Sequence, residues 1–384
     1  MSTALREAIR AAAREVGLAR VGVAPAATVA TAPAFRAWLA AGHAGDMAYL
    51  AREPELRESS ARLLEGARSV LVALVAYEAA PAPPAPGTGL IAAYARGADY
   101  HHLLRERLRA LAAALPALAG RPVATRVAVD TAPLLERAVA ARAGLGFFGK
   151  NTMLITPGVG SYTLLGAVVT DLDLPPDDPS DEADGGVAPP RPPHGHCGRC
   201  TACLDACPTA ALRAPYVLDA RRCLAYLTIE LAGPVPPELR PLVGDRIFGC
   251  DACQAACPFN RHPAPGDPGL APRAAQTRVA LADLVALRSA GYHRLTRGTA
   301  LRRVRAAQLQ RNAAVALGNA GDRAAVPALA GALAARAALV RGHAAWALGR
   351  LGGAAARAAL AAAQARETDP GAAAAIAAAL AAAG

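Results

Sequence analysis

The sequence predicts a protein of the α+β class, built from three parts in succession. Residues 1–175 alternate short β-branched segments with longer helical ones, as a mixed-sheet α/β unit does. All eight cysteines lie between residues 197 and 257, and the chain after them is helical in pattern and contains an internal repeat. We therefore expect an N-terminal mixed-sheet α/β domain at 1–185, a cysteine-rich domain at 186–275 and a helical-repeat domain at 276–384.

The first part of the chain is predicted to contain several strands separated by helices. Short runs rich in Val, Ile and Leu predict the strands, and longer Ala/Leu/Arg segments with helical periodicity predict the helices. The expected strands are 20–24, 69–76, 123–129 and 163–170, and the clearest helices are 102–118 and 132–143. Residues 171–196 are acidic and then rich in Gly and Pro, so we expect an exposed linker there.

The helical tail contains one sequence motif twice. Asn312-AAVALG-Asn319 recurs as His343-AAWALG-Arg350, 31 residues later. Paired helices repeating at about this length are typical of HEAT-like solenoids. We expect a short HEAT-like module stacked on the rest of the protein, with Trp346 in its core.

The charge balance predicts an anionic partner. The 384 residues carry a net charge of +11, with a pI near 9.7. No apolar run reaches the roughly 18 residues of a membrane span, and the N-terminus resembles an amphipathic helix rather than a signal peptide. We therefore expect no membrane association, a cytoplasmic location and no paired disulfides.

Only one of the 41 basic residues is a lysine, Lys150. An ammonium is a compact point charge, whereas a guanidinium is a planar fork, so the two are not interchangeable at a specific site. The sequence therefore favours a dedicated role for Lys150, with chance retention as the alternative.

The cysteine spacing predicts two [4Fe–4S] clusters. The run CxxCxxCxxxCP starting at Cys197 has the spacing of bacterial ferredoxins, in which the fourth cysteine ligates the other cluster. A second run, CxxCxxxCP starting at Cys250, lacks one cysteine, which Cys223 can supply. The ferredoxin-like domain would then hold one cluster on Cys197, Cys200, Cys203 and Cys257, and the other on Cys207, Cys223, Cys250 and Cys253. Zinc is the alternative for such pairs, but it does not account for the triplet or for the two Cys-Pro endings.

Most of the remaining candidate chemistry lies in residues 127–155. Asp130 ends a Val/Ala strand and precedes a helical segment, so it can be a helix cap or a carboxyl group facing a pocket. Gly144, Gly146 and Gly149 form a loop that lets the backbone approach a ligand closely. Because this loop follows a helix rather than a strand, it resembles a phosphate-binding loop only weakly.

Nearly the whole chain resembles the epoxyqueuosine reductase family. The blocks DTAPLLER and CLAYLTIEL are specific to that family rather than to ferredoxins in general. The segments that carry the resemblance are GDMAYL (45–50), YARGADYH (94–101), DTAPLLERAVAARAGLGFFGKNTMLI (130–155), GSYTLLGAVVTDL (160–172), CGRCTACLDACPTAAL (197–212), YVLDARRCLAYLTIEL (216–231), FGCDACQAACPFN (248–260), RNAAVALGN (311–319) and VRGHAAWALG (340–349). Ala225 departs from the serine expected at its position, and the 171–196 linker is longer and more acidic than is usual.

The resemblance implies an oxidoreductase that reduces the epoxide of epoxyqueuosine to queuosine at the wobble position of tRNA, the last step of queuosine biosynthesis. It implies cobalamin bound base-off in the N-terminal domain, with Asp130 as the proton donor, and we expect burial to raise the pKa of Asp130. The residues placed in the cobalamin and substrate pocket by segment are Arg57, Tyr94, Asp130, Lys150, Asn151, Ser161, Tyr226 and Thr228. Because Cys223 leads into YLTIEL, we expect its cluster to lie nearer the cobalt.

A run of arginines without acids, from 288 to 311, predicts contacts with RNA phosphates. The candidates are Arg294, Arg297, Arg302, Arg303, Arg305 and Arg311, with Tyr292 and His293 available to stack on bases. A solvated helix face is the alternative. The expected partners are tRNA bearing epoxyqueuosine and a soluble electron donor of the flavodoxin or ferredoxin type, and we expect a monomer.

Two other functions are compatible with parts of the sequence. A cobalamin and iron–sulfur reductase of the reductive dehalogenase type would share the cofactors, but such enzymes are usually exported and have no arginine-rich helical tail. A non-catalytic electron-transfer or RNA-binding scaffold would need neither a corrin nor a pocket aspartate.

Overall fold

The computed structural model describes residues 2–79, 82–177 and 196–382, and most of the predicted 171–196 linker lies outside these ranges. Within the described residues, no helix combines the length and apolar character needed to cross a membrane. The N-terminal part consists of α1 (Ser2–Glu15), β1 (Arg20–Pro25), α2 (Ala32–Ala40), α3 (Pro54–Glu58), β2 (Ser69–Ala76), β3 (Thr88–Ile91), α4 (Tyr100–Ala119), β4 (Thr125–Ala128), α5 (Glu136–Arg142), β5 (Phe147–Phe148), β6 (Leu154–Ile155) and β7 (Thr163–Thr170).

The cysteine-rich part has short elements, and the tail is helical. The former contains α6 (Ala202–Asp205), β8 (Leu212–Ala214), β9 (Val217–Leu218), the π-helical turn η6 (Tyr226–Glu230), α7 (Arg240–Val243), β10 (Arg246–Phe248) and α8 (Ala252–Ala255). The latter contains α9 (Ala274–Thr277), β11 (Arg278–Ala280), α10 (Leu281–Val285), α11 (Ser289–Thr296), the 3₁₀ turn η9 (Ala300–Arg303), α12 (Ala306–Ala320), α13 (Val326–Ala332), α14 (Ala338–Leu351), α15 (Ala354–Gln364) and α16 (Pro370–Ala382).

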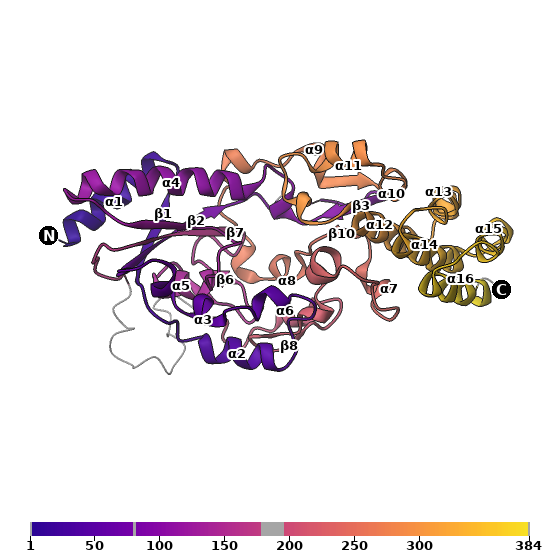
Figure 1. The fold of residues 1–384 in the computed structure, drawn as a ribbon, viewed down its shortest axis with the longest axis horizontal. Helices are drawn as coiled ribbons and strands as arrows, with labels where there is room; N and C mark the ends of the chain where they lie inside the picture. The colour runs from indigo at the N-terminus through magenta and orange to yellow at the C-terminus, as the bar shows by residue number, and fades with distance from the viewer. Residues whose placement is uncertain (1, 80–81, 178–195, 383–384) are drawn as a thin grey trace.

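The four strands predicted from the sequence form one sheet in the order β1-β2-β7-β4, with antiparallel pairing throughout. β2 is apolar along its length because both of its faces are covered. Leu71 packs in the core that contains α1 and α4, whereas Val72 packs against α5 on the opposite face. Figure 1 shows this layering, with α1 and α4 on one side of the sheet and α5 on the other.

The mixed pairing expected from the sequence occurs in a second sheet. β3 pairs in parallel with β10 and antiparallel with β11. Each of these strands comes from a different part of the chain, so this sheet joins all three parts. The fold is therefore α+β as predicted, whereas the boundaries proposed near residues 185 and 275 stay predictions.

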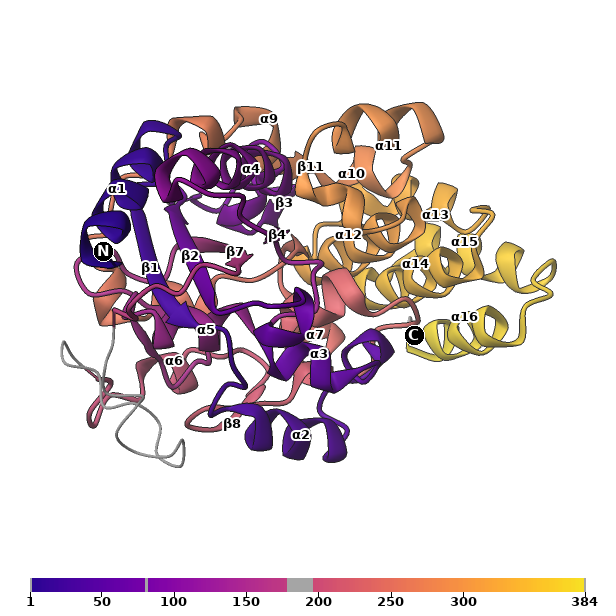
Figure 2. The same ribbon diagram turned by 60° about the vertical axis from the view of Figure 1, so that its left-hand side comes forward.

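The repeated ALG motif of the tail explains how its helices stack. The repeat lies on α12 and α14, which pack side by side and are followed by α16 (Figure 2). A Cβ on Gly318 would lie 2.9 Å from the Cα of Ala347, and one on Gly349 would lie 3.0 Å from the Cα of Ala379. The absence of a side chain at both glycines therefore permits close packing of successive helices.

Arg311 was predicted to contact RNA, and this prediction is wrong. Its side chain is 0% exposed and donates hydrogen bonds to the carbonyls of Leu227, Leu231 and Gly233. Asn312 beside it donates to the carbonyl of Thr228. Because a π-helical turn and the loop after it leave carbonyls without helical partners, α12 supplies these donors and is held against η6.

Replacing Arg311 with Met should strongly destabilise the contact between the tail and η6. The carbonyls of Leu227, Leu231 and Gly233 would lose donors in a buried site, at a cost of roughly 3 kcal/mol or more. Urea unfolding followed by circular dichroism would measure the change. The exposed Arg294→Met is the matched control, and an Arg311→Met midpoint equal to that control would contradict the role assigned to Arg311.

Candidate functional site

The eight cysteines form no disulfide with one another and lie in two adjoining groups. The first group, defined by charge interactions around Cys203 and Cys257, is Cys197, Cys200, Cys203 and Cys257. The second, defined around Cys223, Cys250 and Cys253, is Cys207, Cys223, Cys250 and Cys253. Backbone N–H groups point at the sulfurs, since Lys150 N lies 3.4 Å from Cys197 Sγ and Ala211 N lies 3.2 Å from Cys207 Sγ. The residues of each group are those of one ligand set expected from the spacing, and the assignment of each set to a cluster stays a prediction.

Lys150 binds the backbone of the first cysteine loop. Its Nζ donates to the carbonyl of Gly198 at 2.7 Å and to that of Cys200 at 2.9 Å. Two carbonyls that converge on one point suit a compact ammonium better than a planar guanidinium. The predicted role in the cobalamin pocket is therefore wrong for Lys150, which instead supports the loop that carries Cys197 and Cys200.

A cavity of about 1930 Å³ lies between the N-terminal sheet and the cysteine-rich part. It is lined mainly by aromatic and aliphatic side chains, among them Phe35, Trp38, Leu134, Phe147, Phe148 and Ile229. Its polar residues include Arg57, Tyr94, Asp99, His101, Asp130, Glu136, Tyr226, Glu230 and Arg303, and Cys223 also lines it. A large apolar cavity with few convergent polar groups is the usual form of a cofactor or substrate site.

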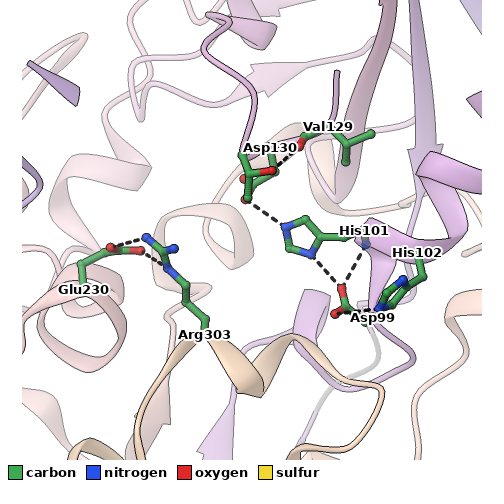
Figure 3. A network of polar contacts seen from close by, with 8 residues as sticks. Asp99, His101, His102, Val129, Asp130, Glu230 and Arg303 are labelled. Carbon is green, nitrogen blue, oxygen red and sulfur yellow. Dashed lines mark hydrogen bonds and ion pairs between the residues drawn. The ribbon is translucent and has the colours of Figure 1, made fainter. Parts of the chain in front are cut away.

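One wall of the cavity carries His101 between two carboxylates (Figure 3). Asp99, the N-cap of α4, accepts from the backbone N–H of His101 and lies 2.7 Å from its Nδ1. The Nε2 of the same ring lies 2.9 Å from Asp130 Oδ2. The ring also stacks on Tyr100 at a centroid distance of 4.0 Å, which helps to set its orientation.

The two carboxylates control the charge of this group. Burial lowers the pKa of His101, but the hydrogen bonds and charges of Asp130 and Asp99 outweigh it and raise the pKa to about 9. Burial raises the pKa of Asp130, but His101 and the more distant Arg303 outweigh it and lower that pKa. The expected raised pKa of Asp130 is therefore wrong: at neutral pH it is a carboxylate paired with an imidazolium.

Asp130 has a backbone conformation unusual for an aspartate. Its φ is +47°, and the N–H of Thr131 donates across it to the carbonyl of Val129. Positive φ in a non-glycine residue costs free energy and persists where the surrounding structure requires it. The alternative of a helix cap is wrong, because α5 begins only at Glu136 after Leu135. The turn instead directs the Asp130 carboxylate toward His101.

Arg303 brings a residue of the tail into the cavity. It forms two hydrogen bonds with Glu230 of η6, at 2.8 and 3.1 Å, and its guanidinium lies 5.6 Å from the centre of the Tyr49 ring. Figure 3 shows this pair facing the Asp130 side of the cavity. The cavity is thus bounded by all three parts of the chain.

Some of the residues assigned to the pocket by resemblance line the cavity, and the others lie outside it. Arg57, Tyr94, Asp130 and Tyr226 line the cavity. Asn151, Ser161 and Thr228 are buried elsewhere and make structural contacts, so their predicted place in the pocket is wrong. Asn151 donates to the carbonyl of Cys253, Ser161 accepts from Asn260, and Thr228 accepts from the N–H of Gly249. Asn151 and Thr228 share segments with cavity residues, but only the fold shows which way each side chain points.

Glu136 is a cavity residue that the sequence reasoning missed. Its Oε1 is buried without a hydrogen-bond partner, and burial raises its pKa to about 8. Arg57 Nε is likewise buried and without a partner. Such atoms usually have partners in native structures, so the cavity offers unmet polar contacts to a ligand. Only the position of Glu136 six residues after Asp130 could have suggested it.

The candidate RNA-binding arginines other than Arg311 are on the surface. The exposed ones are Arg294, Arg297, Arg302, Arg303 and Arg305. Tyr292 is half-buried, and its hydroxyl donates to the carbonyl of Val304, so it is a packing residue rather than a free stacking platform. His293 beside it is exposed.

Three family models match different parts of the chain. The one described as "4Fe-4S double cluster binding domain" matches residues 196–260. "Epoxyqueuosine reductase QueG, DUF1730" matches residues 57–131, and "HEAT repeats" matches residues 297–381. The first match favours iron–sulfur clusters over zinc for the cysteine-rich part.

Curated relatives match over most of the chain. An epoxyqueuosine reductase from Pseudomonas aeruginosa is 41% identical over 322 residues, which cover 82% of this chain and 86% of the relative. The chain belongs to the epoxyqueuosine reductase family. The epoxyqueuosine reductase of Escherichia coli strain K12 is 39% identical over 316 residues, covering 80% and 79%. The chain is thus an oxidoreductase of this family, as the sequence predicted.

Solved structures of the epoxyqueuosine reductase family share the whole fold. A selenomethionine-labelled epoxyqueuosine reductase superposes with a TM-score of 0.89 at 31% identity and covers 99% of both chains. An epoxyqueuosine reductase with an epoxyqueuosine-modified tRNA-Tyr stem loop has a TM-score of 0.88 at 31% identity and the same coverage. In a third, from Bacillus subtilis, an aspartate catalytic loop is swung out of the active site, with a TM-score of 0.87.

The imidazolium of His101 should depend on Asp130. Its pKa is about 9 in the native protein, and in Asp130→Asn it should fall by at least about one unit toward its ordinary value. Because the folded-state pKa is raised, the stabilising contribution is complete below pH 6.5 and is lost as the pH rises through 9. NMR titration of labelled histidine would measure the pKa. An equal His101 pKa in the two proteins would contradict the pairing.

Proposed function

We propose that this chain reduces the epoxide of epoxyqueuosine in tRNA to the alkene of queuosine, using cobalamin and two [4Fe–4S] clusters, with Asp130 delivering protons. The observation that carries this proposal is a single cavity lined at once by the Asp130–His101 pair and by Cys223. The proton-transfer pair and the cluster ligand Cys223 therefore face the same cavity, in which the reaction would take place. The relative solved with a modified tRNA stem loop supports the substrate class.

The cavity fits a cofactor larger than an ordinary small ligand. Pockets for drug-sized ligands hold about 300–1,000 Å³, and this cavity is about 1930 Å³. Arg57, Tyr94 and Tyr226 would hold cobalamin, with apolar side chains around the ring and the unpaired atoms of Glu136 and Arg57 available to its polar groups. Bound cobalamin would supply a low-valent cobalt that reduces the epoxide, with its electrons supplied singly through the clusters.

The cluster on Cys223 is the one nearer the reaction space. Among the described residues, Cys223 is the cysteine that lines the cavity. The first group packs against Phe147, which lines the cavity, but among the described residues none of its four cysteines lines the cavity itself. This arrangement supports the order expected from the sequence, in which the Cys223 group follows the Cys203 group in an electron relay.

Removal of an epoxide oxygen as water consumes two electrons and two protons. Asp130 is ionised, so the first proton originates on His101, passes from Nε2 to Asp130 Oδ2 across 2.9 Å, and leaves from Asp130 to the departing oxygen. Asp99 holds the imidazole in place during this transfer. Glu136, with a pKa of about 8, is protonated at neutral pH and supplies the second proton.

The exposed arginines of α11 and η9 are proposed to bind the tRNA backbone. Arg294, Arg297, Arg302 and Arg305 are exposed, and Arg302 and Arg303 also line the cavity. Phosphate contacts of this kind orient a nucleic acid over a site without reading its sequence. A monomeric, cytoplasmic enzyme with a soluble electron donor stays our prediction.

Anaerobic turnover of epoxyqueuosine tRNA tests the function directly. Protein reconstituted with iron, sulfide and cobalamin and reduced by dithionite should form queuosine, and Asp130→Asn should lower kcat by about 10²–10⁴-fold. His101→Gln and Glu136→Gln should also lower kcat, because each removes a proton source. Wild-type activity should fall as the pH rises through 9, where His101 loses its proton. His262→Gln, at an exposed position outside this network, is the control.

No queuosine from the wild type would overturn the assignment as a whole. Full activity of Asp130→Asn would overturn only the proton-delivery role. Cobalamin binding, followed by the visible spectrum, should survive Asp130→Asn, and its loss would show that the substitution acts on the cofactor instead.

Charge reversal at the proposed tRNA surface should weaken the binding of tRNA. Arg302→Glu and Arg305→Glu should each raise the Kd for tRNA about tenfold and lower the salt slope by about one. Filter binding at several salt concentrations would measure both quantities. Arg366→Glu, on an exposed part of the tail far along the chain, should leave the Kd unchanged. An equal Kd for tRNA and an equal salt slope in all three variants would contradict the proposed tRNA-binding surface.

A further inference from the structure

The residues next to the two cysteine groups differ in their exposure to solvent. Around the second group, the neighbours Leu224, Gly249 and Gln254 are buried. Beside the first group, the loop residues Gly198 and Arg199 are exposed. The first group therefore has an exposed loop beside it, whereas these neighbours of the second group are covered.

The hairpin formed by β8 and β9 presents apolar surface beside the first group. Tyr216 is 54% exposed and Val217 is 37% exposed, and Leu242 is the remaining large hydrophobic among the described residues with comparable exposure. The N–H of Tyr216 donates to the carbonyl of Lys150, whose side chain holds the Cys197–Cys200 loop. The Trp38 indole donates to the carbonyl of Leu218 and fixes the hairpin against α2, at the edge of the molecule (Figure 1).

Among the described residues, the charges around this hairpin are predominantly positive. Arg199 lies between two ligands of the first group, Arg213 lies on β8, and Arg261 follows the Cys257 loop, all of them exposed. Within the described part of the chain, none of these three forms an ion pair with a carboxylate. Asp205 is the nearby exposed acid in the same loop, and it accepts a hydrogen bond from Thr201. The face thus combines a small apolar centre with a basic rim.

We propose that this face, formed by the Cys197–Cys200 loop and the β8–β9 hairpin, is the docking site of a small acidic one-electron carrier. The inference rests on the proposed function and adds the surface by which its electrons enter. Docking surfaces usually have an apolar centre and a polar rim, and complementary charge accelerates encounter. Each docked carrier loses one electron to the first cluster, and two dockings supply the two electrons that one epoxide consumes.

Binding and turnover of separate variants test this proposal. Arg213→Glu and Val217→Ser should each raise the Kd for an acidic flavodoxin by about tenfold, and Arg213→Glu should also flatten the dependence of that Kd on salt. Isothermal titration calorimetry would measure the Kd, and turnover with reduced flavodoxin should show a higher KM at nearly constant kcat. A low-potential acidic ferredoxin serves as the second probe. The surface should recognise the negative charge of a carrier with an accessible redox group, whichever carrier it is.

Matched controls separate this surface from general effects. Arg366→Glu reverses an arginine charge, and Leu242→Ser removes an aliphatic side chain, each at an exposed position elsewhere on the chain. Both variants should leave the flavodoxin Kd and KM within about twofold of the wild-type values. Turnover driven by dithionite should be equal in all variants, because it bypasses docking. An unchanged flavodoxin Kd in Arg213→Glu and Val217→Ser would overturn the docking site. Failure of dithionite-driven turnover in the wild type would overturn the proposed function, while the Kd comparison would still decide the surface.

Discussion

The arrangement of the site depends on the hydrogen bonds that Arg311 and Asn312 donate to the backbone of the π-helical turn η6 and the loop after it. The turn follows Cys223 directly and contributes Tyr226, Ile229 and Glu230 to the cavity. A π-helical turn leaves carbonyls unpaired, and buried carbonyls require donors. The tail provides them from α12, so the same contact positions a cluster ligand, a cavity wall and the surface proposed to bind tRNA.

A second constraint is the placement of charge in an apolar cavity. His101 is charged because two carboxylates face its two ring nitrogens, and Asp130 is charged because His101 faces it. Glu136 has no such partner for its buried oxygen and stays protonated at neutral pH. Neighbouring carboxyl groups thus have pKa values displaced in opposite directions, which is the arrangement that acid–base chemistry needs.

Local sequence patterns predicted the strands and the repeat correctly, because each depends on spacing along the chain. β2 coincides with the predicted 69–76 strand. The pocket residues were harder to predict. Asn151 and Thr228 lie in the same segments as true cavity residues, but their side chains point to backbone groups that only the fold brings near.

Resemblance indicated the family, and periodicity and spacing, which are properties of the chain itself, predicted the α+β class and the two groups of thiols. Only the tertiary structure decided the protonation of Asp130, because its pKa depends on His101, 29 positions away. It also decided that Arg311 supports η6 while neighbouring arginines face the solvent, because burial depends on the packing of α12. Charge state and side-chain direction are set by contacts between distant segments, which local sequence patterns do not record.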